Sequence, residues 1–140
     1  MGVAAVTHEQ IIELDGRELD AAVHEGVYGV PVHWVGKALI GHEEPIAQGY
    51  MVPHYSRDMD WAWDVVLRMA RLGYGMEMHV DMPAGEALPS AEVSFGRTRT
   101  DLARNRCSAD DVATAICRAA LVALWEDGLP GTQVAFGGEG

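Results

Sequence analysis

Two long apolar helical segments, with an alternating segment between them, constrain the fold of this chain most strongly. In residues 56–72 the apolar side chains, from Met59 to Leu72, cover more of the helix than the usual stripe of about 100°. Residues 108–128 carry a second helical pattern that is rich in alanine, which permits close approach of a neighbouring element. A helix that is apolar on more than one side needs cover on more than one side. Both segments therefore predict layers of structure packed against them.

The segment between these helices alternates with a period of two. It has an apolar face and a polar face, made of Tyr74, Met76, Met78 and Val80 on one side and Glu77, His79 and Asp81 on the other. The same alternation returns in residues 91–96, and Pro83, Gly85 and Pro89 lie between the two runs. Alternation with a turn-rich connection is typical of paired strands. We predict an antiparallel hairpin.

The start of each long helix is marked by a serine of the kind that caps helices. Ser56 precedes the first, and Ser108 precedes the second, with Asp111 three residues later as in a capping box. We therefore expect helix N-termini at both serines.

The first 55 residues contribute a helix, a strand and a loop. A helical pattern in residues 15–29 ends at glycines, residues 30–40 predict a strand that Pro31 limits to a sheet edge, and residues 41–55 predict a long loop. The complete order of elements predicts an α+β protein, an α/β/α sandwich with a small, mainly antiparallel sheet between helices. With 140 residues, of which 49% are hydrophobic, we expect a single domain with a core over residues 9–126 and a flexible tail over 127–140.

Charge and composition narrow the class of partner. Ten Lys and Arg residues against 21 Asp and Glu give a net charge of -11, which argues against DNA or RNA as a partner because nucleic acids attract basic surfaces. No apolar run approaches the roughly 20 residues of a membrane span, so we expect no membrane contact and a location in the cytosol of the host cell. Cys107 and Cys117 fit no zinc or disulfide pattern, and Cys117 falls in the apolar helix as a free thiol.

One basic segment stands out in this acidic chain. Four of its nine arginines fall within ten positions, offset by Asp101: Arg97, Arg99, Arg104 and Arg106. Guanidinium groups match phosphate oxygens, and the predicted helix start at Ser108 adds backbone N–H groups, so the segment predicts an anion site. The alternative is a solvated loop whose arginines pair with the protein's own carboxylates.

Aromatic residues offer a stacking surface for the same ligand. Trp61 and Trp63 point about 200° apart on a helix, so one of them packs the core and the other meets a second layer or stacks on a base. Tyr55, just ahead of the helix, extends this predicted aromatic wall.

Metal and catalytic chemistry have little support. No histidine pair has a zinc spacing, and the nearest approach to a ligand set is His42, Glu43 and Glu44 together with His54. We therefore expect no metal, no cofactor and no catalytic residues. A small hydrolase that uses His79, or the loop carrying His42 and His54, is the minor alternative.

Three motifs in order resemble the phage ABA-sandwich domain family. They are Gly16-Arg-Glu-Leu-Asp-Ala-Ala-Val23 followed by Gly29, then Tyr55-Ser-Arg-Asp-Met-Asp-Trp-Ala-Trp-Asp-Val-Val66, then Ala115-Ile-Cys-Arg-Ala-Ala-Leu-Val-Ala-Leu124. The resemblance spans residues 9–126 and implies an α/β/α sandwich of phage or prophage origin. The chain departs from the family pattern in residues 36–54 and 97–106, and the family supplies no catalytic residues to carry over.

Two functions follow as hypotheses. The first is a non-catalytic binding protein that sequesters a phosphorylated, cyclic nucleotide signal of host immunity, with the four arginines on its phosphates and a tryptophan on its base. The second is an acidic inhibitor or decoy that binds a host defence protein. Because the 57–72 helix and the alanine stripe exceed what a small monomer buries, we also expect a homo-oligomer, with a dimer preferred.

Overall fold

The structure of the protein is a computed structural model that describes residues 8–41, 49–81, 85 and 90–128. The helices are α1 (His8–Ile12), α2 (Gly16–Gly26), α3 (Met59–Arg71), α4 (Arg99–Arg104) and α5 (Val112–Glu126). The strands form two antiparallel sheets, one of β1 (Val32–Val35), β2 (Ala38–Gly41) and β3 (Tyr50–Met51), the other of β4 (Gly75–Asp81), β5 (Ser90–Gly96) and β6 (Cys107–Ala109). The predicted α+β class with antiparallel strands is confirmed.

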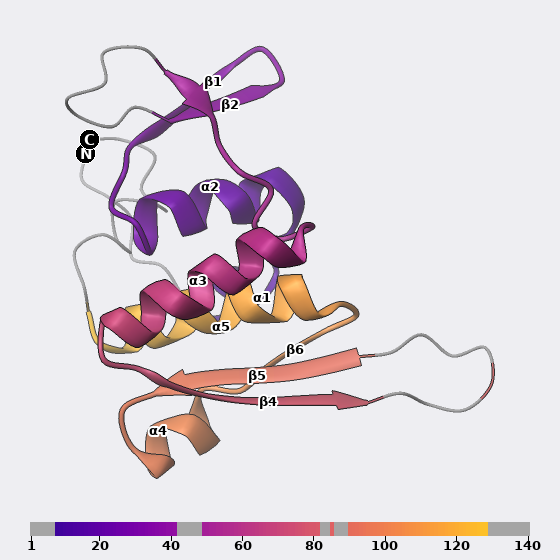
Figure 1. Ribbon diagram of the computed structural model, residues 1–140, viewed down its shortest axis with the longest axis vertical. Coiled ribbons are helices and arrows are strands. Elements are labelled where there is room, and N and C mark those ends of the chain that lie inside the picture. The colour runs from indigo at the N-terminus through magenta and orange to yellow at the C-terminus, as the bar shows by residue number, and fades with distance from the viewer. Residues whose placement is uncertain (1–7, 42–48, 82–84, 86–89, 129–140) are drawn as a thin grey trace.

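Helix α5 is the centre of the molecule. It lies between the β4–β5–β6 sheet on one side and α2 and α3 on the other (Figure 1). Eleven of its fifteen residues are buried, and five of these are alanines. Small side chains let three elements approach the same helix closely. The alanine stripe is therefore buried within the monomer, and the expectation that it exceeds what a monomer buries is wrong. The free thiol of Cys117 is buried in this helix, as predicted.

The β4–β5–β6 sheet has one covered face and one mostly open face. Ala91, Val93 and Phe95 of β5 are buried on the side of α5. On the other face the short helix α4 lies at one end of the sheet, where Gly96 passes close to it (Figure 1). The sandwich thus has a long helix on one face of the sheet and a single six-residue helix on part of the other.

Figure 1 places the small β1–β2–β3 sheet at the end of the molecule that is farthest from β4–β6, beside α2. The prediction of one strand over residues 30–40 is wrong, because the chain reverses between Val35 and Ala38. Gly36 has φ +60°, a conformation that glycine adopts without strain, and it makes the two-residue turn of a hairpin. Within the predicted loop 41–55, Tyr50 and Met51 form β3, and residues 42–48 lie outside the described residues.

The predicted helix starts are also corrected. Asp58, two residues after Ser56, caps α3 with its carboxylate on the N–H of Asp60. Ser108 belongs to β6, and Asp111 caps α5 through the N–H of Thr114 at 2.8 Å. In both cases an aspartate nearer to the helix takes the capping role, because its carboxylate also complements the helix dipole.

The β4–β5 hairpin is confirmed, with Gly75 opposite Gly96 and Asp81 opposite Ser90. Its predicted turn residues Pro83 and Pro89, and residues 129–140 of the predicted tail, lie outside the described residues. None of the helices that the structure describes is long and apolar enough to cross a membrane.

Candidate functional site

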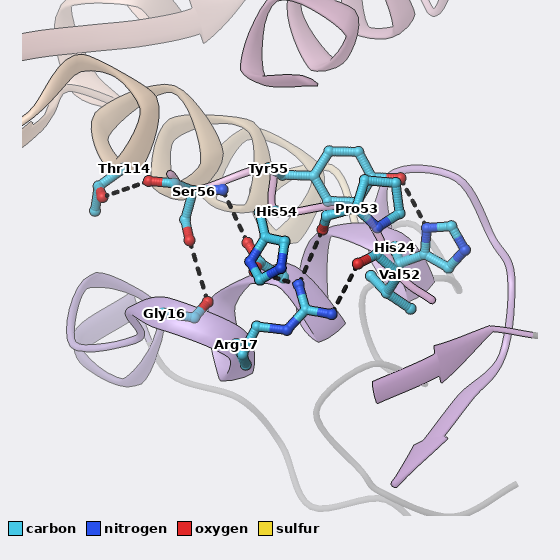
Figure 2. A network of polar contacts seen from close by, with 10 residues as sticks. Gly16, Arg17, His24, Val52, Pro53, His54, Tyr55, Ser56 and Thr114 are labelled. Carbon is cyan, nitrogen blue, oxygen red and sulfur yellow. Dashed lines mark hydrogen bonds and ion pairs between the residues drawn. The ribbon is translucent and has the colours of Figure 1, made fainter. Parts of the chain in front are cut away.

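A buried carboxylate organises the polar contacts between α2 and the segment that precedes α3. Asp20 of α2 is fully buried, and it accepts hydrogen bonds from the Ser56 N–H at 2.8 Å and from Arg17 at 2.8 Å. Arg17 also donates to the carbonyl oxygens of Val52 at 2.7 Å and Pro53 at 3.2 Å (Figure 2). A buried charge is tolerated when it is paired and hydrogen-bonded in this way. The network fixes residues 52–56 on α2.

The same segment is held from two further directions. The Ser56 hydroxyl donates to the Gly16 carbonyl at 3.2 Å, and the Thr114 hydroxyl of α5 donates to the Ser56 carbonyl at 3.2 Å (Figure 2). His54 lies with its Nδ1 3.8 Å from Asp20 and keeps nearly half of its side chain exposed. Because the oxygens of Asp20 already accept two hydrogen bonds and the Ser56 hydroxyl is engaged with a carbonyl, the geometry favours a structural role over a nucleophile–base pair.

Beside this network lies a compact aromatic cluster around His24. Its ring nitrogens contact the Tyr55 hydroxyl at 2.8 Å and the Tyr50 hydroxyl at 2.9 Å, and Tyr28 stacks on Tyr55 with ring centroids 5.4 Å apart. Tyr28 in turn donates to Asp64 at 2.5 Å. Burial raises the pKa of both Tyr28 and Tyr55 above the ordinary tyrosine value. These hydroxyls therefore act as neutral hydrogen-bonding groups.

Among the predicted aromatic ligands, Tyr55 is buried in this cluster. Trp61 contacts the edge of the Tyr55 ring at a centroid distance of 6.0 Å, and Trp63 points elsewhere on α3, as the spacing predicts. Both tryptophans are exposed by more than two fifths, so the prediction that one of them packs the core is wrong: the buried face of α3 is made of Ala62, Val65, Val66 and Met69. The pair does not form one wall with Tyr55.

The predicted arginine cluster is distributed over α4 and its flanks. Arg97 lies over the Tyr74 ring at 4.6 Å and 3.9 Å from Asp127. Arg104 is 3.1 Å from Asp101 and 3.5 Å from Glu126. Arg106, described below, also lies next to carboxylates, so three of the four arginines fit the alternative in which they pair with the protein's own acidic residues. Arg99 is exposed in the first turn of α4.

Arg106 directly precedes β6 and Ser108 lies within it, beside the open sheet face. Arg106 is 3.8 Å from both Glu77 and Glu92, and these residues border a shallow polar hollow of about 570 Å³ that also includes His79. The Ser94 hydroxyl at its base is buried without a hydrogen-bond partner. Two carboxylates flank the one arginine, so the hollow offers a phosphate little net attraction.

Metal ligands do not gather in the part of the chain that the structure describes: no three His, Cys, Asp or Glu side chains there could hold an ion. His42, Glu43 and Glu44 lie outside the described residues.

Two exposed apolar surfaces are further candidate sites, and of these the sequence analysis singled out only the apolar helix of residues 57–72. The first, which we call the hairpin surface, consists of Trp34 and Val35 at the end of the β1–β2 hairpin and Met51 of β3, with exposures of 47%, 59% and 60%. The sequence signal for this surface was the tryptophan and valine directly before Gly36. Their side chains point to opposite faces of a strand, and the end of a hairpin cannot bury both faces.

The second is the α3–β4 surface, whose five side chains are between 39% and 47% exposed: Met59, Trp63, Leu67, Met78 and Val80. The first three are spaced by four residues, so they share one face of α3 next to its buried face. Met59 and Val80 line the same hollow, which joins the helix stripe to β4. The spacing of four and the broad apolar pattern in residues 56–72 were the sequence signals.

Comparison with known proteins gives a structural likeness without a family. No family model matches this chain, and no curated protein matches it. A phage protein from Bacillus cereus ATCC 14579 is similar in structure, with a TM-score of 0.48 and 15% sequence identity over 91% of this chain and 94% of that chain. At this identity the likeness concerns the fold alone. The resemblance to the phage ABA-sandwich family stays a prediction from the three sequence motifs.

Proposed function

We propose that this chain is a non-catalytic binding protein that holds another protein through its hairpin surface. The observation that supports this function is the exposure of Trp34, Val35 and Met51 at one end of the molecule. Large apolar side chains that are exposed together at one end of a small soluble protein mark interaction sites, and tryptophan contributes more to binding energy than most residue types.

The form of the hairpin suggests the shape of the partner. Trp34 and Val35 are successive residues of a strand, so their side chains project from opposite faces. Met51 lies on the same face as Val35. It is opposite Ile40, Ile40 is opposite His33, and His33 shares a strand face with Val35, two residues later. An element that is apolar on both faces fits a groove better than a flat surface. The partner in this proposal is a protein with an apolar groove.

The charge of the chain suggests what borders that groove. At -11 the protein repels acidic surfaces and attracts basic ones over about 8–10 Å at physiological ionic strength. A groove rimmed by Lys and Arg would therefore associate fastest. Together with the resemblance to a phage family, this makes a host defence protein the partner that we propose.

The geometry gives less support to sequestration of a phosphorylated nucleotide. A phosphate would have to displace Asp101 or Glu126 from Arg104, and Glu77 or Glu92 from Arg106. The predicted stacking residue Trp61 lies on α3, on the other side of α5 from the sheet that carries Arg106 (Figure 1). The four arginines and the tryptophans thus do not face one ligand.

The test compares the wild-type protein with a Trp34→Ala, Val35→Ala variant as baits in a bacterial extract, followed by purification of the captured protein and calorimetry. We expect one defined protein that binds the wild type, binds the variant at least tenfold more weakly, and dissociates more readily as salt is raised. Both side chains are exposed, so the variant should keep the thermal stability of the wild type.

A Trp63→Ala variant is the matched control, since it removes an equally exposed tryptophan from another surface. Equal capture by the wild type and the hairpin variant would refute the proposal. Calorimetric heat with a cyclic nucleotide that disappears in Arg104→Ala would establish the sequestration hypothesis in its place.

A further inference from the structure

The β4–β5–β6 sheet ends in a strand whose outer edge is long and regular. In this sheet β5 pairs with β4 on one side, and β4 is the terminal strand of the order β4–β5–β6. Its seven residues contain no proline and no lysine, the residue types that commonly protect such edges. An edge strand presents unpaired N–H and C=O groups, which accept another strand of suitable register.

The side chains next to this edge are apolar on the face turned towards the helices. Met78 is opposite Val93 and Val80 is opposite Ala91, and both of these partners are buried against α5. Met78 and Val80 are nevertheless about two fifths exposed, because β4 extends beyond the cover of the helix. Together with Met59, Trp63 and Leu67 they form the α3–β4 surface, which continues from the sheet edge to a helix.

We propose that this edge binds a second copy of the chain, with β4 paired antiparallel to the partner copy's β4 around Met78. The reason lies in the register. When two identical antiparallel strands pair about a two-fold axis, directly opposite residues point to the same face of the sheet. Because neighbouring residues of one strand point to opposite faces, the axis cannot pass between two residues, and one residue must face its own copy. For β4 the three central choices are Glu77, Met78 and His79.

Charge selects among these three registers. Centring on Glu77 brings the two Glu77 carboxylates together, and centring on His79 brings Glu77 opposite Asp81 twice. Centring on Met78 brings Glu77 opposite His79 twice, where a carboxylate meets a ring nitrogen that donates to it. Like charges directly opposite destabilise paired strands, and complementary pairs stabilise them.

The same register matches the apolar face. Met78 meets its own copy, and Met76 meets Val80 twice, so the face turned towards the helices is apolar along its length. Met59, at the start of α3, borders the same hollow as Val80, so the α3 stripes of the two copies begin beside this joint. The dimer then has one continuous sheet of six strands, with α5 of each copy on one face and the short α4 of each copy on part of the other.

Cysteine cross-linking tests the register directly. Residues that face each other in antiparallel strands have Cα atoms about 4.5–5.5 Å apart, within the range of a disulfide. Met78→Cys should therefore give a covalent dimer under mild oxidation, which reduction reverses. Glu77→Cys is the control, since its two copies lie roughly 8 Å apart in this register, beyond disulfide reach. The native Cys107 and Cys117 are buried and do not compete.

Sedimentation of the unmodified chain provides the second measurement. We expect a species of twice the 15.1 kDa chain mass for the wild type, and a shift to the monomer for Met78→Lys, which places two like charges at the axis. The Trp34→Ala, Val35→Ala variant should remain dimeric, which separates this proposal from the hairpin surface. The proposal would be overturned if the wild type were a monomer. It would also be overturned by a dimer in which Met78→Cys does not cross-link, whether or not Glu77→Cys does.

Discussion

Removing the carboxylate of Asp20 should destabilise the fold strongly, although this residue is one aspartate among many in an acidic chain. In Asp20→Ala the buried Ser56 N–H loses its acceptor, which costs about 1–3 kcal/mol for an unsatisfied buried group. The charge-assisted hydrogen bond from Arg17 is lost as well, and because Arg17 is about one fifth exposed, water replaces it in part and the additional cost is about 1 kcal/mol.

The sum is about 3 kcal/mol, a large share of the roughly 5–15 kcal/mol of a typical domain. For a chain of this size it corresponds to a fall in the melting temperature of about 10 °C. Urea unfolding followed by tryptophan fluorescence measures it, because Trp61 contacts Tyr55 of the segment that Asp20 holds.

Asp15→Ala is the matched control. Asp15 precedes the same helix, is exposed and makes no capping hydrogen bond with its side chain, so its loss should cost less than about 0.5 kcal/mol. Asp20→Asn, whose amide oxygen still accepts from Ser56, should fall between the two. If Asp20→Ala were no less stable than Asp15→Ala, the inference that this network holds residues 52–56 on α2 would be wrong.

Two further predictions concern a glycine and a half-buried glutamate. Gly96→Ala should lower stability by about 1–3 kcal/mol in thermal melts, because the added Cβ would lie 2.5 Å from the Asp101 Cβ and 2.9 Å from the Leu102 nitrogen. Gly75 is opposite Gly96 in the sheet, and a Cβ there meets only a contact of 3.5 Å, so Gly75→Ala should be tolerated in the same melts. Burial raises the pKa of the Glu25 carboxyl from 4.5 to about 7, although the hydrogen bond from the Val32 N–H lowers it in part. As pH rises, the unfolded chain therefore releases this proton at a lower pH than the folded chain does. Stability should therefore decrease from pH 4.5 to pH 7, and Glu25→Gln should remove that part of the pH dependence in urea titrations; an unchanged slope would contradict it.

The sequence alone determined the elements whose signals are local. The breadth of the apolar pattern in residues 56–72, the alanine stripe near the C-terminus and the alternation of residues 74–96 each gave an element of the correct type. Periodicity predicts these because burial on one face repeats every 3.6 or two residues, whatever the element packs against.

Boundaries that depend on one or two residues were less predictable. The reversal at Gly36, the short helix α4 and the strand β6 escaped periodicity, because each is too short to show a repeat. Ser108 has the right chemistry for a cap, but its backbone is taken up in pairing with Glu92 of β5. The sheet therefore decided where α5 begins.

The tertiary structure alone decided which candidate residues share a surface. Four arginines within ten positions indicate a cluster only if the chain keeps them together, and here α4 and β6 direct Arg104 and Arg106 to different carboxylates. Conversely, Met59 of α3 and Val80 of β4 are 21 positions apart and border one hollow, because the fold brings the start of α3 to the end of the edge strand β4. Sequence patterns record which face of each element avoids water. Which of those faces finds a partner inside the chain, and which is left for another molecule, depends on long-range packing that no local pattern encodes.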